Sequence, residues 1–265
     1  MRARVIFFSQ FAFTVLVAAF LIVPAVLSMA AGVTTNYFRG IRSGFTLQWV
    51  IQVWELYADT IARSFVVALL TLAVTLVVGV PAAYALHVRG GRLSRAIEEI
   101  ITLPLAIPGL AIALALLLSY GTFSDFRRSS LFIVAGHVVF TLPFMVRSVM
   151  AIFSSIDVKT LDESASSLGA APWRRFRDVI VPNALPGILA GSLMVVTLSL
   201  GEFNLTWMLH TPLTKTLPVG LADSYASMRL EVASAYTLVF FVMIIPLLVA
   251  MQIFADSGGR KGARK

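Results

Sequence analysis

Long apolar stretches alternate with short polar segments along most of the chain. A helix needs about 20 mostly apolar residues to cross the roughly 30 Å hydrocarbon core of a bilayer. Six stretches are long enough, at approximately residues 5–27, 64–86, 100–120, 131–153, 184–209 and 232–255. The pattern predicts an all-α, polytopic membrane protein whose six transmembrane helices form a single domain over residues 1–265.

The composition supports a membrane location. Hydrophobic residues make up 58% of the chain and charged residues only 13%, against roughly a quarter charged in soluble domains. The net charge of +8 comes from basic residues in the short segments between apolar stretches, where they meet membrane lipid rather than nucleic acid. The absence of cysteine excludes a disulfide framework, a thiol nucleophile and a cysteine-based metal site.

Basic residues also predict the orientation. With both termini in the cytoplasm, fourteen Lys and Arg lie inside and six outside, with Arg63 at a boundary. The six outer residues are Arg39, Arg42, Arg127, Arg128, Lys215 and Arg229. This excess predicts a multi-pass protein of the bacterial cytoplasmic (inner) membrane with both termini cytoplasmic. The first stretch could be a cleavable signal peptide, but its length favours a retained anchor.

The cytoplasmic segment 154–183 is far longer than the roughly 2 to 8 residues that usually connect bundle helices. Its pattern predicts two short amphipathic helices. Thr160 and Glu163 have the spacing of a capping box at the start of the first helix. The apolar face of that helix is Leu161, Ala165 and Leu168.

A turn is expected between these two helices. Gly169 can adopt the left-handed conformation that ends a helix, and Pro172 suits the first turn of the next one. Pro182 is expected to stop the second helix before the membrane. Its apolar stripe is Trp173, Phe176 and Val179. The basic residues expected to point away from much of that stripe are Arg174, Arg175 and Arg177.

The same segment carries a recognisable motif. Glu163-Ser164-Ala165, Gly169 after three residues, and Val179, Val181 and Pro182 resemble the EAA signature of type I ABC importer permeases. Ser164 replaces the second residue of the signature, and valines replace its Ile and Leu. Three further segments resemble the branch that imports polyamines, ferric iron or phosphonates: 103–109, 142–147 and 201–203.

This resemblance implies the type I permease fold and a path for a small solute of the polyamine, phosphonate or ferric iron type. It also implies two ATPase subunits that hold ATP and Mg, a second permease subunit, identical or homologous, and an external solute-binding protein. The segment 154–183 would then be the coupling-helix loop. The residues expected to couple to the ATPase are Thr160, Leu161, Glu163, Ser164, Ala165, Leu168, Gly169, Pro172, Trp173, Phe176 and Pro182.

The chain itself shows no sign of catalysis. It has no phosphate-binding loop of the G-x-x-x-x-G-K-[ST] type, no catalytic pair and no metal-ligand cluster. We therefore expect a transport subunit that is not an enzyme and binds no cofactor or metal. An ion-gradient-driven secondary transporter or channel is the alternative.

Ionisable residues within the apolar stretches are the remaining candidates. Glu202, with Phe203 and Asn204, is expected to line the translocation path or an outer gate, the alternative being an interfacial position in contact with water. His137 is expected to be packed and hydrogen-bonded rather than a proton relay. Arg147 is expected to reach the lipid headgroups, the alternative being a salt bridge to the coupling loop.

Overall fold

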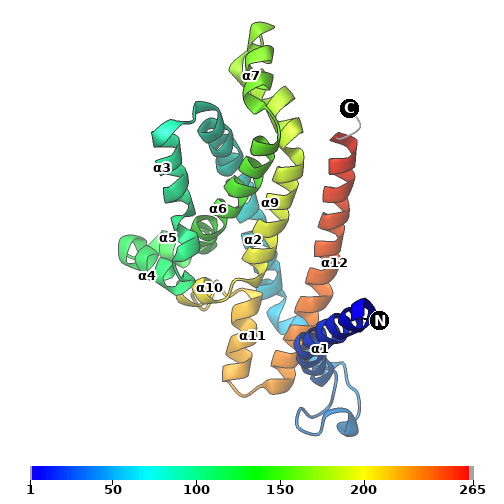
Figure 1. The fold of residues 1–265 in the computed structure, drawn as a ribbon. Coiled ribbons are helices and arrows are strands. Elements are labelled where there is room, and N and C mark those ends of the chain that lie inside the picture. The colour runs from blue at the N-terminus through cyan, green and yellow to red at the C-terminus, as the bar shows by residue number, and fades with distance from the viewer. Residues whose placement is uncertain (1, 263–265) are drawn as a thin grey trace. The chain divides into compact units, whose positions relative to one another are not determined.

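The computed structural model describes residues 2–262 and is almost entirely helical (Figure 1). Within these residues, β-structure is limited to an isolated bridge between Thr34 and Phe45. The α-helices are α1 (Arg2–Ala31), α2 (Gln48–Arg89), α3 (Gly91–Thr102), α4 (Gly109–Tyr120), α5 (Ser124–Arg128), α6 (Ser130–Ser155), α7 (Val158–Ser167), α8 (Pro172–Arg174), α9 (Val181–Gly201), α10 (Asn204–Leu209), α11 (Leu217–Ala226) and α12 (Leu230–Gly262). The short helices η1 (Gly40–Ser43) and η2 (Leu103–Ala106) are 3₁₀, and η3 (Arg175–Ile180) is π-helical.

The chain divides into two compact units. The first comprises Met1–Asp59 and Gly220–Ile244, and the second comprises Thr60–Val219 and Ile245–Lys265. The long helices α2 and α12 contribute residues to both units. The second unit contains every candidate site residue.

The described residues contain five single helices that are long and apolar enough to span a membrane, or six spans when one bent pair is included. The single helices are Ile6–Ala31, Gln48–Arg89, Ser130–Ser155, Pro172–Gly201 and Leu230–Ile253. The all-α architecture is thereby confirmed, with five to six spans where six were predicted. Arg264 and Lys265, two of the fourteen basic residues expected on the cytoplasmic side, lie outside the described residues.

The third span is not the single helix that the apolar run at 100–120 predicted. Gly91–Ala106 and Gly109–Tyr120 meet at an angle of 109°. Pro108 disfavours helical geometry at the residue before it, and Ile107 is extended at φ −99° and ψ 129°. The apolar run continues through this break, so the length of the run gave no indication of the bend.

The second span starts at Gln48 rather than near residue 64. Its additional N-terminal turns carry exposed Glu55 and Asp59, which interrupt the apolar pattern without preventing a helix. Tyr57 interrupts this part of the helix with φ −130° and ψ 16°.

In the first unit, the end of α1 packs closely on the start of α12. A Cβ on Gly32 would lie 2.6 Å from the Ser234 carbonyl carbon, so only glycine fits there. The Tyr37 N–H donates to Glu231 Oε1 at 2.9 Å, and Arg229 Nη1 donates to the Tyr57 hydroxyl at 2.8 Å. These contacts tie both ends of the unit's sequence together.

In the second unit, α6 and α9 pack side by side (Figure 1). Met145, Val149 and Val195 are fully buried in the core that these helices share with α2. Close approach depends on glycine, since a Cβ on Gly187 would lie 2.6 Å from the Ser148 carbonyl oxygen. The close contact between α6 and α9 therefore requires glycine at position 187.

Gly187→Ala should therefore destabilise the protein. Its added methyl group must displace the Ser148 backbone or the Ile152 side chain, and overpacking of this kind typically costs about 1–3 kcal/mol. Thermal unfolding in detergent measures the loss. Gly201→Ala is the matched control, because a Cβ there meets no atom within 4 Å. Equal melting temperatures for the two variants would contradict the tight α6–α9 contact.

Candidate coupling site and translocation path

Helix α7 begins at Val158, one position after its cap. Asp157 Oδ1 accepts from the Thr160 N–H at 3.1 Å, and Asp157 Oδ2 accepts from the Thr160 hydroxyl at 2.6 Å. These hydrogen bonds lower the pKa of Asp157 below its usual value. The predicted capping box of Thr160 and Glu163 is wrong, because a carboxylate one turn earlier is at least as good an N-cap as threonine.

The turn after α7 follows the sequence prediction. Gly169 has φ +80°, its N–H donates to the Ser166 carbonyl at 2.9 Å, and the Ala170 N–H donates to the Ala165 carbonyl at 3.1 Å. This pair of bonds is the Schellman motif that closes helices on a left-handed glycine. Pro172 then opens the next helix. The two short helices are thus joined by a turn of defined geometry.

The second helix does not stop at Pro182. From α8 it passes through η3 into α9, and Pro172–Gly201 forms one 30-residue helix. A proline in a helix normally clashes with the carbonyl four residues earlier and cannot donate a hydrogen bond to it. The segment just before Pro182 is π-helical, so its carbonyl groups are bonded in a wider i to i+5 pattern, which accommodates the proline. The second predicted helix is therefore continuous with a candidate membrane span.

The residues of the two predicted apolar stripes differ in their exposure to solvent. Ala165 is buried, whereas Leu161, Phe176 and Val179 are partly buried. Leu168 and Trp173, in contrast, expose 88% and 63% of their surface. The motif residues Glu163 and Ser164 are also exposed. The two most exposed residues of the predicted apolar stripes therefore lie on either side of the turn at Gly169.

A buried polar cluster around Asp162 of α7 was missed from the sequence. Asp162 Oδ1 accepts from the Tyr84 hydroxyl at 2.6 Å, and Asp162 Oδ2 accepts from Arg175 Nη1 at 2.9 Å. Arg175 thus turns inward rather than away from the apolar stripe. A signal was available, because Asp162 shares a helical face with Val158 and Ala165 at the i, i+4, i+7 spacing.

At the other end of the second unit, Glu202 interrupts the helix that precedes it. Its backbone is extended, and its Oε1 accepts from the Leu205 N–H at 2.7 Å in the first turn of α10. Asn204 is exposed, and the Phe203 ring lies 5.3 Å from the Trp207 ring. The hydrogen-bond partner of the Glu202 carboxylate is thus a backbone group of α10.

Two further polar contacts hold α10. His137, fully buried in α6, bonds Ser199 Oγ at 2.8 Å and Thr206 Oγ1 at 2.7 Å. Arg127 Nη1 donates to the Leu209 carbonyl at 2.7 Å, at the end of α10. The packed, hydrogen-bonded environment expected for His137 is confirmed. The short helix α10 is therefore fixed at its start, middle and end by three other segments.

The bend of the third span lies next to Glu202. A Cβ on Gly109, the first residue of α4, would lie 3.6 Å from Glu202 Oε1. Helices α4 and α10 also pack against each other. Two broken helices therefore meet around one carboxylate, an arrangement that transporters use to expose backbone groups near a solute path.

Comparison with known proteins identifies the family. The model of the family described as "binding-protein-dependent transport system inner membrane component" matches residues 75–257. The chain belongs to this family. It is the transmembrane permease subunit of an ABC importer, which replaces the alternative of a gradient-driven carrier or channel.

Relatives of this permease include a Salmonella typhimurium protein described as a putative 2-aminoethylphosphonate transport system permease protein, PhnV. It is 26% identical over 250 residues, which cover 94% of each chain. The molybdenum transport system permease protein ModB of Azotobacter vinelandii is 30% identical over 210 residues, covering 74% of this chain and 92% of its own.

Two solved structures share the fold of the permease. A chain of the MetNI methionine ABC transporter in inward-facing conformations matches with a TM-score of 0.64 at 18% identity, covering 80% of this chain and 98% of its own. A chain of a bacterial ABC transporter that imports the acidic polysaccharide alginate matches with a TM-score of 0.68 at 16% identity, covering 98% and 95%.

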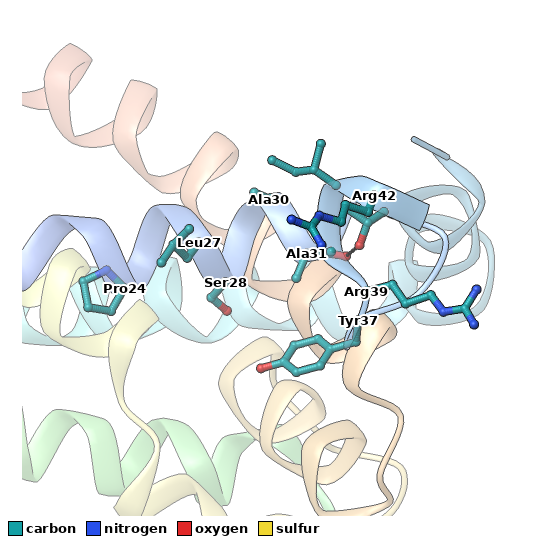
Figure 2. A pocket seen from close by; sticks show the side chains of 11 residues that line it. Pro24, Leu27, Ser28, Ala30, Ala31, Tyr37, Arg39 and Arg42 are labelled. Atoms are coloured by element: carbon teal, nitrogen blue, oxygen red, sulfur yellow. Dashed lines mark hydrogen bonds between the residues drawn. The ribbon is translucent and has the colours of Figure 1, made fainter. Parts of the chain in front are cut away.

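The first unit of the permease has a hollow of about 680 Å³ beside the end of α1. Figure 2 shows Arg42 turned back toward Ala30 and Ala31, while Arg39 extends away from α1. Apolar residues of α1 form much of the wall. Across the described residues, no group of three or more His, Asp or Glu side chains is placed to hold a metal ion.

Proposed function

We propose that residues 157–182, the coupling segment, dock onto a cytoplasmic ATPase partner and pass its movement to the spanning helices. The observation that carries this proposal is the pair of apolar side chains, Leu168 and Trp173, exposed on either side of the fixed turn at Gly169. Such side chains in a segment rigidly held from behind are suited to a partner surface.

Energy for transport comes in this proposal from two ATPase subunits, which hold the ATP and Mg. A second permease subunit, identical or homologous, completes the path, and an external binding protein delivers the solute. Both termini lie in the cytoplasm, so that the coupling segment faces the ATPases. The outward-facing arginines, including Arg39 and Arg42, then meet membrane lipid headgroups or water.

The path is proposed to pass Glu202, Phe203 and Asn204, where the breaks before α4 and α10 meet. The two relatives named above have phosphonate and molybdenum compounds in their descriptions. These descriptions support a small solute such as a phosphonate, whereas the polyamine and ferric iron types rest on the resemblance of the sequence segments 103–109, 142–147 and 201–203. The Glu202 carboxylate is already bonded to a backbone N–H, which favours a role in shaping the gate over direct binding of a cation.

Leu168→Asp should release the ATPase. The side chain is almost fully exposed in the isolated chain, so the substitution leaves folding unchanged, but a charge buried without a partner in the docked interface is strongly unfavourable. Leu213→Asp is the matched control, since Leu213 is 81% exposed at a position far from the coupling segment in sequence. Copurification with the ATPase and solute uptake are measured in membranes containing equal amounts of each variant. If Leu168→Asp retains both at the level of the control, the coupling segment does not dock.

Glu202→Gln should alter uptake while assembly stays normal. The amide oxygen of glutamine can still accept from the Leu205 N–H, so α10 keeps its start, and only the charge is lost. Complex yield and uptake by reconstituted vesicles are compared with Glu99→Gln, which neutralises an exposed carboxylate on α3. Unchanged uptake kinetics would remove the Glu202 charge from the path or gate.

A further inference from the structure

The Asp162 side chain joins α7 to two other elements. Tyr84 lies on α2, 78 residues earlier in the chain, and Arg175 lies on η3, 13 residues later. Each carboxylate oxygen has one short contact, to a different element. Asp162 therefore links α7 to α2 and to the helix that continues from η3 into α9, and we call these two bonds the Asp162 node.

Burial makes this node strong. The side chains of Asp162 and Arg175 retain only 11% and 19% of their exposure. Buried Arg175 Nε has no hydrogen-bond partner among the described residues, and the guanidinium charge is compensated through Nη1, which pairs with Asp162 Oδ2 at 2.9 Å. Removing one partner of a buried pair is costly because the other charge is left without compensation.

The apolar contacts around the node are organised in the same way. The Tyr84 ring lies 5.5 Å from the Phe176 ring, which lies 5.9 Å from the ring of Trp173. Trp173 is one of the two exposed residues beside the turn. A continuous chain of packed groups therefore runs from the exposed tip of the coupling segment to α2.

Helix α7 has only ten residues, and helices of that length are marginal without tertiary support. If α7 were held only by its chain connections, its displacement could be absorbed by tilting of α7 itself. A bond to each of α2 and η3 prevents that tilt, so that all three elements move together.

We propose that Asp162 is a positioning residue for energy coupling: through Tyr84 and Arg175 it transmits the displacement of α7 to α2 and to the continuous helix η3–α9. This inference rests on the proposed docking of the coupling segment. It adds that docking and transmission are separable, because Asp162 is buried on α7, whereas Leu168 and Trp173, the residues proposed to dock, are exposed and lie outside α7.

The experiment reconstitutes the whole transporter and measures ATP hydrolysis and solute uptake in the same vesicles. Asp162→Asn should leave the ATPase bound and hydrolysing ATP, while solute moved per ATP falls by about tenfold, within the range of known coupling effects between sites. Tyr84→Phe, which removes one hydroxyl, should give a smaller fall in the same ratio. A role limited to stability would instead lower assembly, hydrolysis and uptake together.

Two further variants sharpen the test. Arg128→Gln is the matched control, because Arg128 is an exposed arginine on α5, outside the coupling segment. The exchange Asp162→Arg with Arg175→Asp restores an ion pair between α7 and η3 and should recover part of the lost ratio. If the Asp162→Asn permease does not assemble with its partners, the ratio of uptake to hydrolysis in Tyr84→Phe alone decides the test.

A normal ratio of uptake to hydrolysis in Tyr84→Phe and in any assembled Asp162→Asn complex would overturn the inference. That result is distinct from failure of the proposed function, which shows as normal ATPase binding and uptake in Leu168→Asp.

Discussion

The bonds of one buried carboxylate, Asp162, set the geometry of the segment that is proposed to couple this permease to an ATPase. They fix α7 against α2 and η3, and so decide which face of α7 is hidden and which is presented. Asp162 and its partly buried partners lie on one side of α7, and the exposed Leu168 lies beside the turn that follows this helix. The buried bonds of Asp162 therefore hold in place the exposed apolar residues on either side of the turn at Gly169.

Continuity of the backbone extends this rigidity into the membrane. The helix that begins at Pro172 runs to Gly201 without a break, and α9 packs on α6 through contacts that only glycine allows. At its far end the helix breaks at Glu202, where α10 is fixed by side chains from three other segments. The second unit thus has one unbroken element between the coupling segment and the candidate path.

Local rules predicted much of this arrangement from the sequence. Gly169 and Pro172 were assigned correctly because a left-handed glycine and an N-terminal proline impose their geometry on a few neighbouring residues. The capping box predicted at Thr160 was wrong because Asp157, one turn earlier, caps the helix instead. The role of Pro182 was wrong because a π-helical turn, which has no clear sequence signature, accommodates the ring. The Asp162 cluster was missed because Tyr84 lies 78 residues earlier in the chain, and only tertiary packing brings it near.

The most direct test of docking uses the absence of cysteine from the chain. Leu168→Cys places a single thiol at the exposed tip, and its rate of maleimide labelling is measured for the permease alone and in complex with its ATPase, with Leu213→Cys as the control. The account predicts that the complex protects the thiol at position 168 and leaves the control thiol equally reactive. Equal labelling of the position 168 thiol with and without bound ATPase would contradict docking through the coupling segment.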